Sequence, residues 1–285
     1  MKSILLWIAA QLGIPHLFGH YTFTLAQFRE RVVRALHKHK PGLAIEQPDE
    51  EHLTIKSPDG ASNTCFLGNS YRVYQQNGRE YDDLIKKLLQ HATLDTSTLE
   101  LQMQRESILA ILKPMDFIDA IQRQVQEAVP APQPIFMPFS SNLAVCFVQD
   151  LPNGMRYLDS NDMETLGLSI DGVFHLALEN FRKRFKIEWL GGNGMWLPKV
   201  DGNYESAVLL SPSSINYLRA QVQGRLLALP LNRDLILFGG ENNKNIPTII
   251  EELLQKTASL PYPLSRTWLV YEGGKFVDYS PVMAQ

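Results

Sequence analysis

Residues 201–206, with the sequence Asp-Gly-Asn-Tyr-Glu-Ser, place an acid, a tyrosine and a serine in one glycine-containing loop between apolar segments. Such a loop is suited to line a cleft. A serine becomes a nucleophile only when a base lies beside it. His175 is the only histidine in this half of the chain, and no Gly-x-Ser-x-Gly turn surrounds Ser206. We therefore expect Asp201 and Ser206 to cap backbone groups of a turn, with a ligand- or partner-binding loop as the other interpretation.

A second charged group, the adjacent pair Arg233 and Asp234, stands between two apolar runs. A half-buried arginine needs a carboxylate, because an unpaired buried charge costs several kcal/mol. Asp159, Asp201 and Asp234 are the candidates for that role. An arginine held in this way also suits bidentate binding of a carboxylate or phosphate. No residue is assigned a catalytic role, and the candidate ligand- or partner-binding residues are Asp201, Tyr204, Ser206, Arg233 and Asp234.

Motifs for metals and cofactors are weak in this sequence. Four histidines have spacings that are compatible with a zinc ion, namely His16, His20, His37 and His39. Pro15 and Gly19 disfavour a regular helix around the first two, so we expect structural or solvated histidines and no metal. The glycine-containing turn at 238–245 matches neither Gly-x-x-x-x-Gly-Lys-Ser/Thr nor Gly-x-Gly-x-x-Gly. No cofactor is therefore expected.

The composition limits the class of protein. The chain has 285 residues, of which 45% are hydrophobic and 20% charged, and this is ordinary for a globular protein of about two domains. Lys+Arg 27 against Asp+Glu 30 gives a net charge of −3, which argues against a nucleic-acid binder. Two cysteines, Cys65 and Cys146, exclude a disulfide framework and fit a reducing cytoplasm. The oligomeric state is not decided by these data.

The N-terminal part predicts a first, small unit. Residues 1–22 are expected to form a helical extension whose apolar run is too short to span a bilayer. Membrane contact is not expected, although a membrane-peripheral role through residues 1–14 stays open. Residues 23–93 predict an α-β-β-β-α unit with a helix at 24–38, strands at 43–46, 52–55 and 63–74, and a second helix from about residue 82. Thr24 and Gln27 have capping-box spacing.

The rest of the chain predicts a connection and a second layered unit. Residues 94–134 are expected to form a connecting segment with a buried strand at 108–112, a helix and a proline-rich spacer at 130–134. Residues 135–285 predict a C-terminal α+β unit that includes hairpins at 143–158 and 267–279. Strands and helices mix without regular βαβ alternation. The fold class is therefore α+β, with mixed or antiparallel sheets covered by helices in two layered units.

Several stretches together resemble one family in order and spacing. They are 110–114 with Phe117, 155–158 with 166–169, 177–181, 201–207 with 209–210, and 228–230 with 233–235. Over about residues 24–279 the chain resembles the YtpQ-like bacterial proteins, the domain of unknown function 1444 family. The Asp-Gly-x-Tyr-x-x-Ser and Arg-Asp-Leu segments are its most specific parts. This resemblance implies no activity, cofactor or catalytic residue.

The α-β-β-β-α opening is also similar to type III secretion chaperone-like folds, which bind polypeptide segments. Fold analogy does not fix function. We expect a cytoplasmic protein that binds a protein or peptide partner and performs no chemistry, through an exposed sheet edge or apolar groove. Selectivity would come from the 201–206 loop, the Arg233 region and a basic first helix with Arg29, Arg31, Arg34, Lys38 and Lys40.

An enzyme is the alternative interpretation. A hydrolase or transferase would need Asp201, Ser206 and Arg233 to meet in one concave pocket beside a titratable group with a shifted pKa. The sequence leaves the question of catalysis undecided and favours the binding protein.

Overall fold

The computed structural model describes residues 23–47, 49–56, 62–76, 83, 85–87, 103–127, 134–151, 154–192, 194–246 and 253–279. The expected helical extension at 1–22, which includes His16 and His20, lies outside the described residues, as does the segment on which a membrane-peripheral role depends. The chain divides into two units, Met1–Gln102 with Ala258–Pro261 and Met103–Thr257 with Tyr262–Gln285. Within the described ranges, no helix is both long enough and apolar enough to cross a membrane.

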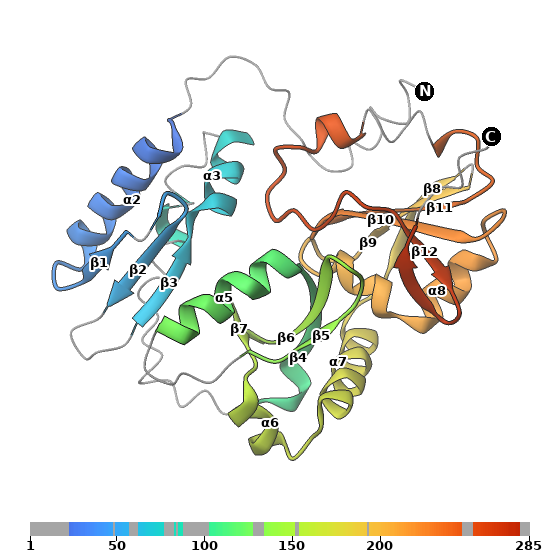
Figure 1. Ribbon diagram of the computed structural model, residues 1–285, viewed down its shortest axis with the longest axis horizontal. Helices are drawn as coiled ribbons and strands as arrows, with labels where there is room; N and C mark the ends of the chain where they lie inside the picture. Colours follow the sequence, from blue (N-terminus) through green and yellow to red (C-terminus); the bar gives the residue numbers. More distant parts are fainter. Residues whose placement is uncertain are drawn as a thin grey trace. The chain divides into compact units, whose positions relative to one another are not determined.

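The first unit packs helices against a three-stranded sheet (Figure 1). Its elements are α2 (Leu25–His39), β1 (Ala44–Glu46), β2 (His52–Lys56), β3 (Ser62–Phe66) and α3 (Leu67–Gln76). The strands pair antiparallel in the order β1-β2-β3. One core buries Phe28, Val32 and Leu36 of α2 together with Leu53 and Ile55 of β2. The first helix, the three strands that follow it and the capping box at Thr24 are confirmed. The second predicted helix, from about residue 82, lies largely outside the described residues.

The predicted third strand at 63–74 is wrong in its second half, because α3 begins at Leu67. Leu67, Tyr71 and Tyr74 recur at a helical spacing and pack into the core of the first unit. The hydroxyl groups of the two tyrosines also hold the backbone of Phe23. The N–H of Phe23 donates to the Tyr74 oxygen at 3.0 Å, and the Tyr71 hydroxyl donates to the carbonyl of Phe23 at 2.8 Å. Packing therefore overrides the strand propensity of these tyrosines.

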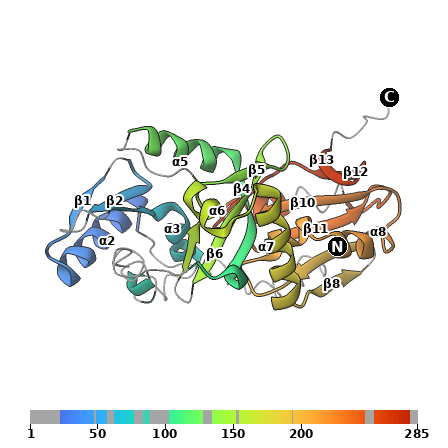
Figure 2. The same cartoon turned by 90° about the horizontal axis from the view of Figure 1, so that it is seen from below.

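The second unit contains a four-stranded antiparallel sheet. Its strands are β4 (Ile108–Pro114), β5 (Phe136–Pro138), β6 (Leu143–Leu151) and β7 (Gly154–Tyr157). β6 pairs with β4 along one side and with β5 and β7 along the other. The helix α7 (Ile170–Arg184) packs on β4 and β6, while α5 (Met115–Glu127) follows directly from β4 (Figure 2).

The structure places β4 and α5 inside the second unit, not in the connecting segment expected at 94–134. β4 pairs with β6 from Ile108 opposite Gln149 to Pro114 opposite Leu143. Since α5 and β5 separate these two strands in the sequence, no local pattern indicates their pairing. Pro134, at the end of the proline-rich spacer, forms an isolated bridge with Asp159, and 130–133 lie outside the described residues.

A six-stranded antiparallel sheet forms the other layer of the second unit, in the order β13-β12-β10-β11-β9-β8. The strands are β8 (Glu188–Gly192), β9 (Met195–Lys199), β10 (Leu226–Asn232), β11 (Leu235–Gly240), β12 (Leu269–Glu272) and β13 (Lys275–Asp278). The short helices α6 (Ser160–Leu166) and α8 (Pro212–Arg219) and the 3₁₀ turn η2 (Arg105–Ser107) also belong to this unit. The α+β class with antiparallel sheets is therefore confirmed.

The 3₁₀ segment η3 (Glu205–Leu210) lies between the two sheets of this unit. All of its residues are buried, and it contacts β4 of one sheet as well as β9 and β11 of the other. One hydrophobic core, which includes Ala207, Val208 and Leu209, spans both sheets. The charged loop that precedes η3 is therefore anchored at its end by buried structure.

Candidate functional site

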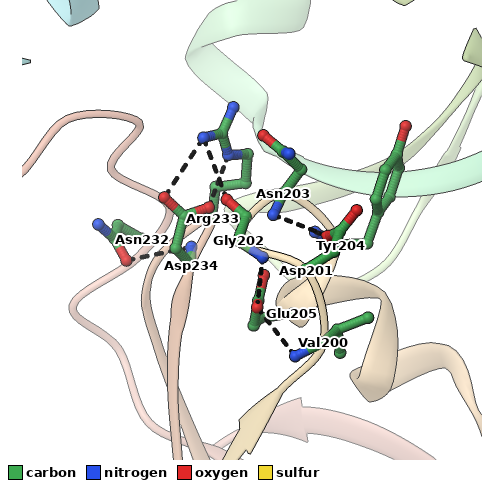
Figure 3. A network of polar contacts seen from close by, with 9 residues as sticks. All are labelled: Val200, Asp201, Gly202, Asn203, Tyr204, Glu205, Asn232, Arg233 and Asp234. Atoms are coloured by element: carbon green, nitrogen blue, oxygen red, sulfur yellow. Dashed lines mark hydrogen bonds and ion pairs between the residues drawn. The ribbon is translucent and has the colours of Figure 1, made fainter. Parts of the chain in front are cut away.

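The backbone of the loop that leads into η3 is held by hydrogen bonds to carboxylates of the same segment (Figure 3). Oδ1 of Asp201 accepts hydrogen bonds from the N–H of Asn203 at 3.0 Å and of Tyr204 at 3.2 Å. Gly202 has a φ of 87°, a conformation that glycine adopts without strain. The predicted capping role of Asp201 is thus confirmed.

The second acceptor is Glu205, which the sequence analysis does not select. This residue is 3% exposed, and its Oε1 accepts from the N–H of Val200 at 3.0 Å and of Gly202 at 2.8 Å. Its Oε2 is buried and has no hydrogen-bond partner among the described residues. Burial raises the pKa of Glu205, against the opposing effect of the two amide donors. The sequence signal for Glu205 is its position at the start of a run of apolar residues, because a carboxylate buried there needs hydrogen-bond donors.

Ser206 does not cap the turn, and that expectation is wrong. Its side chain is fully buried and its Oγ has no partner in the described part of the chain. Its N–H donates to the carbonyl of Arg233 at 3.2 Å. A hydroxyl enclosed between two sheets lacks the access to substrate that a nucleophile needs.

Arg233 finds the carboxylate that the sequence predicts, and it is the neighbouring Asp234. Nε donates to Oδ1 at 2.7 Å and Nη2 to Oδ2 at 3.3 Å, while Nη2 also donates to the carbonyl of Gly202 at 3.3 Å. The guanidinium lies over the ring of Tyr262, with its carbon 3.8 Å from the ring centroid. Burial lowers the pKa of Arg233, but the hydrogen bond to Asp234 and the charges of Asp234 and Glu205 together outweigh it and leave that pKa raised. Arg233 thus stays charged and ties β10–β11 to the loop.

A pocket with a volume of about 550 Å³ lies beside this loop, entirely within the second unit. We call it the loop pocket. It is lined by Gln104, Asp150, Leu151, Met155, Arg184, Asp201, Asn203 and Tyr204. The walls of the pocket therefore come from β6, β7, α7 and the loop, together with the residue that directly precedes η2.

An ion pair and a tyrosine form one wall of the loop pocket. Arg184, at the end of α7, pairs with Oδ2 of Asp150 in β6. The Tyr204 hydroxyl donates to Oδ1 of Asp150 at 2.7 Å, and the Tyr204 ring packs against Phe185 with 5.1 Å between centroids. Burial and then the bond to Asp150 raise the pKa of Tyr204, so it remains a neutral donor.

The five predicted residues separate into two groups. Asp201 and Tyr204 line the loop pocket, whereas Ser206, Arg233 and Asp234 do not. The Arg233 side chain donates to the carbonyl of Gly202, and the Arg233 carbonyl accepts from the N–H of Ser206. Gln104, Asp150 and Arg184 cannot be selected from the sequence, because they come from segments distant in the chain and belong to no motif.

Two further expectations concern an apolar groove and a metal ion. Among the described residues, Tyr217, which is 43% exposed, is the single exposed large hydrophobic residue, so the expected apolar groove is not found in this part of the chain. No group of three or more His, Cys, Asp or Glu side chains gathers in the same ranges in a way that suits a metal ion.

The chain is similar to UPF0354 proteins. A UPF0354 protein of Listeria innocua is 21% identical over 257 residues, which cover 88% of this chain and 93% of the relative. One of Staphylococcus aureus is 21% identical over 203 residues, 69% of this chain and 68% of the relative. One of Staphylococcus epidermidis is 25% identical over 103 residues, which cover 35% of this chain and 36% of the relative.

No family model and no solved structure matches the chain. The similarity is to a family of uncharacterised proteins and brings no activity with it. The YtpQ-like resemblance and the chaperone-like fold analogy both stay predictions.

Proposed function

We propose that the protein is a non-catalytic binding module, of an adaptor or chaperone-like kind, that holds a segment of a peptide or protein partner in the loop pocket. The observation that carries the proposal is the composition of the loop pocket. It combines acidic, basic, amide and apolar side chains around a volume of about 550 Å³. Such a volume falls within the ~300–1,000 Å³ of ordinary ligand sites.

The free polar groups of the pocket suit a peptide with a cationic group. Asp150 is already neutralised by Arg184 and Tyr204. Asp201 uses Oδ1 for its own loop, so Oδ2 is left to accept from an amine. The side-chain amides of Gln104 and Asn203 make no hydrogen bond within the described residues. Each amide offers a donor and an acceptor, which is what a peptide backbone requires.

The hydrolase or transferase alternative receives no support from this geometry. Its proposed nucleophile, Ser206, is enclosed and lies outside the loop pocket. Nε and Nη2 of Arg233 already donate hydrogen bonds to Asp234 and Gly202. Asp201, Ser206 and Arg233 thus do not meet in one concave pocket, which that alternative requires.

We place the module in the cytoplasm, as the composition predicts. Both cysteines are free thiols, with Cys146 buried and Cys65 half-buried. Burial raises the pKa of Cys65 to about 11 and that of Cys146 to about 12, which keeps both thiols protonated and slow to oxidise. No contact with nucleic acid or membrane forms part of the proposal.

Binding of defined synthetic peptides to the full chain tests the proposal. Two peptides that differ only in a central lysine or glutamate are titrated by calorimetry. We expect the lysine peptide to bind more tightly and Asp201→Asn to remove that preference, because the amide keeps the loop acceptor and loses the charge. Asp278→Asn makes the same change at an exposed aspartate outside the pocket and should leave the preference intact. Equal binding by wild type and Asp201→Asn contradicts the proposal.

A further inference from the structure

The exposed side of α2 carries a line of positive charges. Arg31, Arg34 and Lys38 are all exposed, and spacings of three and four residues place them along one side of the helix. We call these three residues the basic stripe. The buried side of α2 packs into the core of the first unit, so the helix is fixed and the stripe projects from a rigid support.

Arg31 is held in place while its hydrogen-bond donors stay unused. Its guanidinium carbon lies 3.8 Å from the ring centroid of Phe23. That ring stacks on the ring of Tyr74 with 5.5 Å between centroids, and the hydroxyls of Tyr71 and Tyr74 bind the Phe23 backbone. Within the described residues, the Arg31 guanidinium has neither a hydrogen bond nor an ion pair. A guanidinium stacked on a ring keeps its edge free for two parallel hydrogen bonds to one carboxylate.

Arg34 and Lys38 continue the stripe with little competition from acids of the chain. Arg34 pairs with Glu30 at 3.6 Å, and both side chains are more than half exposed, so the pair is weak. Lys38 has no hydrogen bond and no ion pair in the part of the chain that the structure describes. Residues 24–40 contain five Lys or Arg and one Glu, so positive charge is concentrated here in a chain whose net charge is −3.

The acids that flank α2 limit the shape of an anionic partner. The segment between β1 and β2 brings the exposed Asp49, Glu50 and Glu51 to the helix, because Arg29 donates to the Asp49 carbonyl at 3.0 Å. A membrane or a nucleic-acid duplex is wider than one helix and would meet these carboxylates as well as the stripe. A narrow segment that follows the stripe avoids this repulsion. The surroundings therefore favour a single polypeptide segment that carries carboxylates.

We propose that the basic stripe binds an acidic segment of a protein partner. Arg31 and Lys38 are seven residues apart, which is about 10 Å along a helix. Aspartates or glutamates that recur within this length reach all three cations, and Arg31 is the anchor because it is held on a ring and has no competing acceptor. The stripe belongs to the first unit and the loop pocket to the second, so the proposal stands or fails separately from the proposed function.

Binding of a labelled acidic peptide to the full chain tests the stripe. The probe is a short peptide of alternating glutamate and serine, and its counterpart has glutamine in place of glutamate. By fluorescence anisotropy we expect the glutamate peptide to bind more tightly. Arg31→Gln should weaken its binding about two- to fivefold, and the double variant with Lys38→Gln about tenfold. Arg219→Gln removes another exposed arginine that lies over a ring, that of Tyr271 at 5.4 Å in the second unit, and should leave the affinity unchanged.

Further arms identify the class of the partner. Vesicles with anionic lipid and a DNA duplex are titrated with the same variants. Tighter binding to either of them than to the glutamate peptide, lost in Arg31→Gln, assigns the stripe to a membrane or nucleic acid and overturns the proposal. Equal binding of the glutamate and glutamine peptides also overturns it, as do equal losses in Arg31→Gln and Arg219→Gln. Asp201→Asn should not alter binding of the glutamate peptide; a change would place that peptide in the loop pocket and overturn the proposal.

Discussion

Glu205 couples the shape of the candidate loop to a buried charge. Its Oε1 holds the backbone on both sides of Asp201, through Val200 and Gly202, and its Oε2 finds no partner in the described residues. Burying an ion without full hydrogen bonding costs free energy. The carboxylate thus positions the loop at a cost to the stability of the folded chain.

Replacing Glu205 by glutamine should reveal this cost. The Gln oxygen can accept the same two N–H groups, so Glu205→Gln should unfold at no lower urea concentration than wild type near neutral pH. Glu205→Ala leaves both amides unsatisfied and should lose about 2–3 kcal/mol. Because the folded state binds the Glu205 proton more tightly than the unfolded state does, the wild-type stability should fall as pH rises from 4.5 through the raised pKa.

Urea titrations at several pH values check this prediction. Glu205→Gln should lack the part of the pH dependence that belongs to Glu205. Glu106→Gln makes the same change at an exposed glutamate and should keep the wild-type profile. A wild-type stability that rises over the same pH range relative to Glu205→Gln would show that the sign is wrong.

At the scale of elements, α7 positions the pocket through one buried amide. Nδ2 of Asn180 donates to the carbonyl of Arg105 at 2.6 Å and to that of Ile108 at 2.9 Å. These bonds tie α7, which carries Arg184, to η2 and β4. Gln104, another residue of the loop pocket, directly precedes η2.

Asn180→Ala should therefore destabilise the chain and loosen the pocket. Two carbonyls lose their donor and a small void forms, so we expect a loss of about 2 kcal/mol in urea unfolding. Glu179→Ala, one residue earlier on the exposed side of α7, removes only a surface ion pair with Lys183 and should leave the urea midpoint close to that of wild type. Equal losses for the two variants would mean that Asn180 does not hold α7 in place.

Most elements can be predicted from sequence where the signal is local. The capping box at Thr24 and the hairpin at 267–279 each depend on residues a few positions apart, and both appear. The strand β4 is predicted as an element but not in its sheet, because its partner β6 lies beyond α5 and β5. The segment from Leu67 is mistaken for a strand because tyrosines suit both states and only packing decides.

The candidate site is predicted only in part for the same reason. Asp201 and Tyr204 belong to one motif, and the sequence selects them. Asp150 and Arg184 complete the pocket from β6 and α7, and nothing local marks them. Glu205 is visible in the motif, but its role depends on the burial of η3 between two sheets.

At the scale of the whole molecule, the loop pocket depends on one of the two units. Every lining residue belongs to the unit formed by Met103–Thr257 with Tyr262–Gln285. One hydrophobic core spans both sheets of this unit. The first unit has a separate core built from α2, β2 and α3.

A fragment of residues 103–285 should therefore fold and bind the lysine peptide as the full chain does. Circular dichroism and a cooperative thermal transition check the fold, and calorimetry compares the two affinities. A folded fragment that binds much more weakly than the full chain would show that the first unit contributes to the site.

The central claim is that the loop pocket binds a peptide without chemical change, and the methyl group of Met155 reports on it directly. Met155 lines the pocket, whereas Met195 is buried in β9 and does not. In a ¹³C-methyl NMR titration with the lysine peptide, we expect the Met155 signal to shift and saturate, the Met195 signal to stay in place, and the peptide to be recovered intact. A peptide that binds without moving the Met155 signal, or that is cleaved or modified during the titration, would contradict the account.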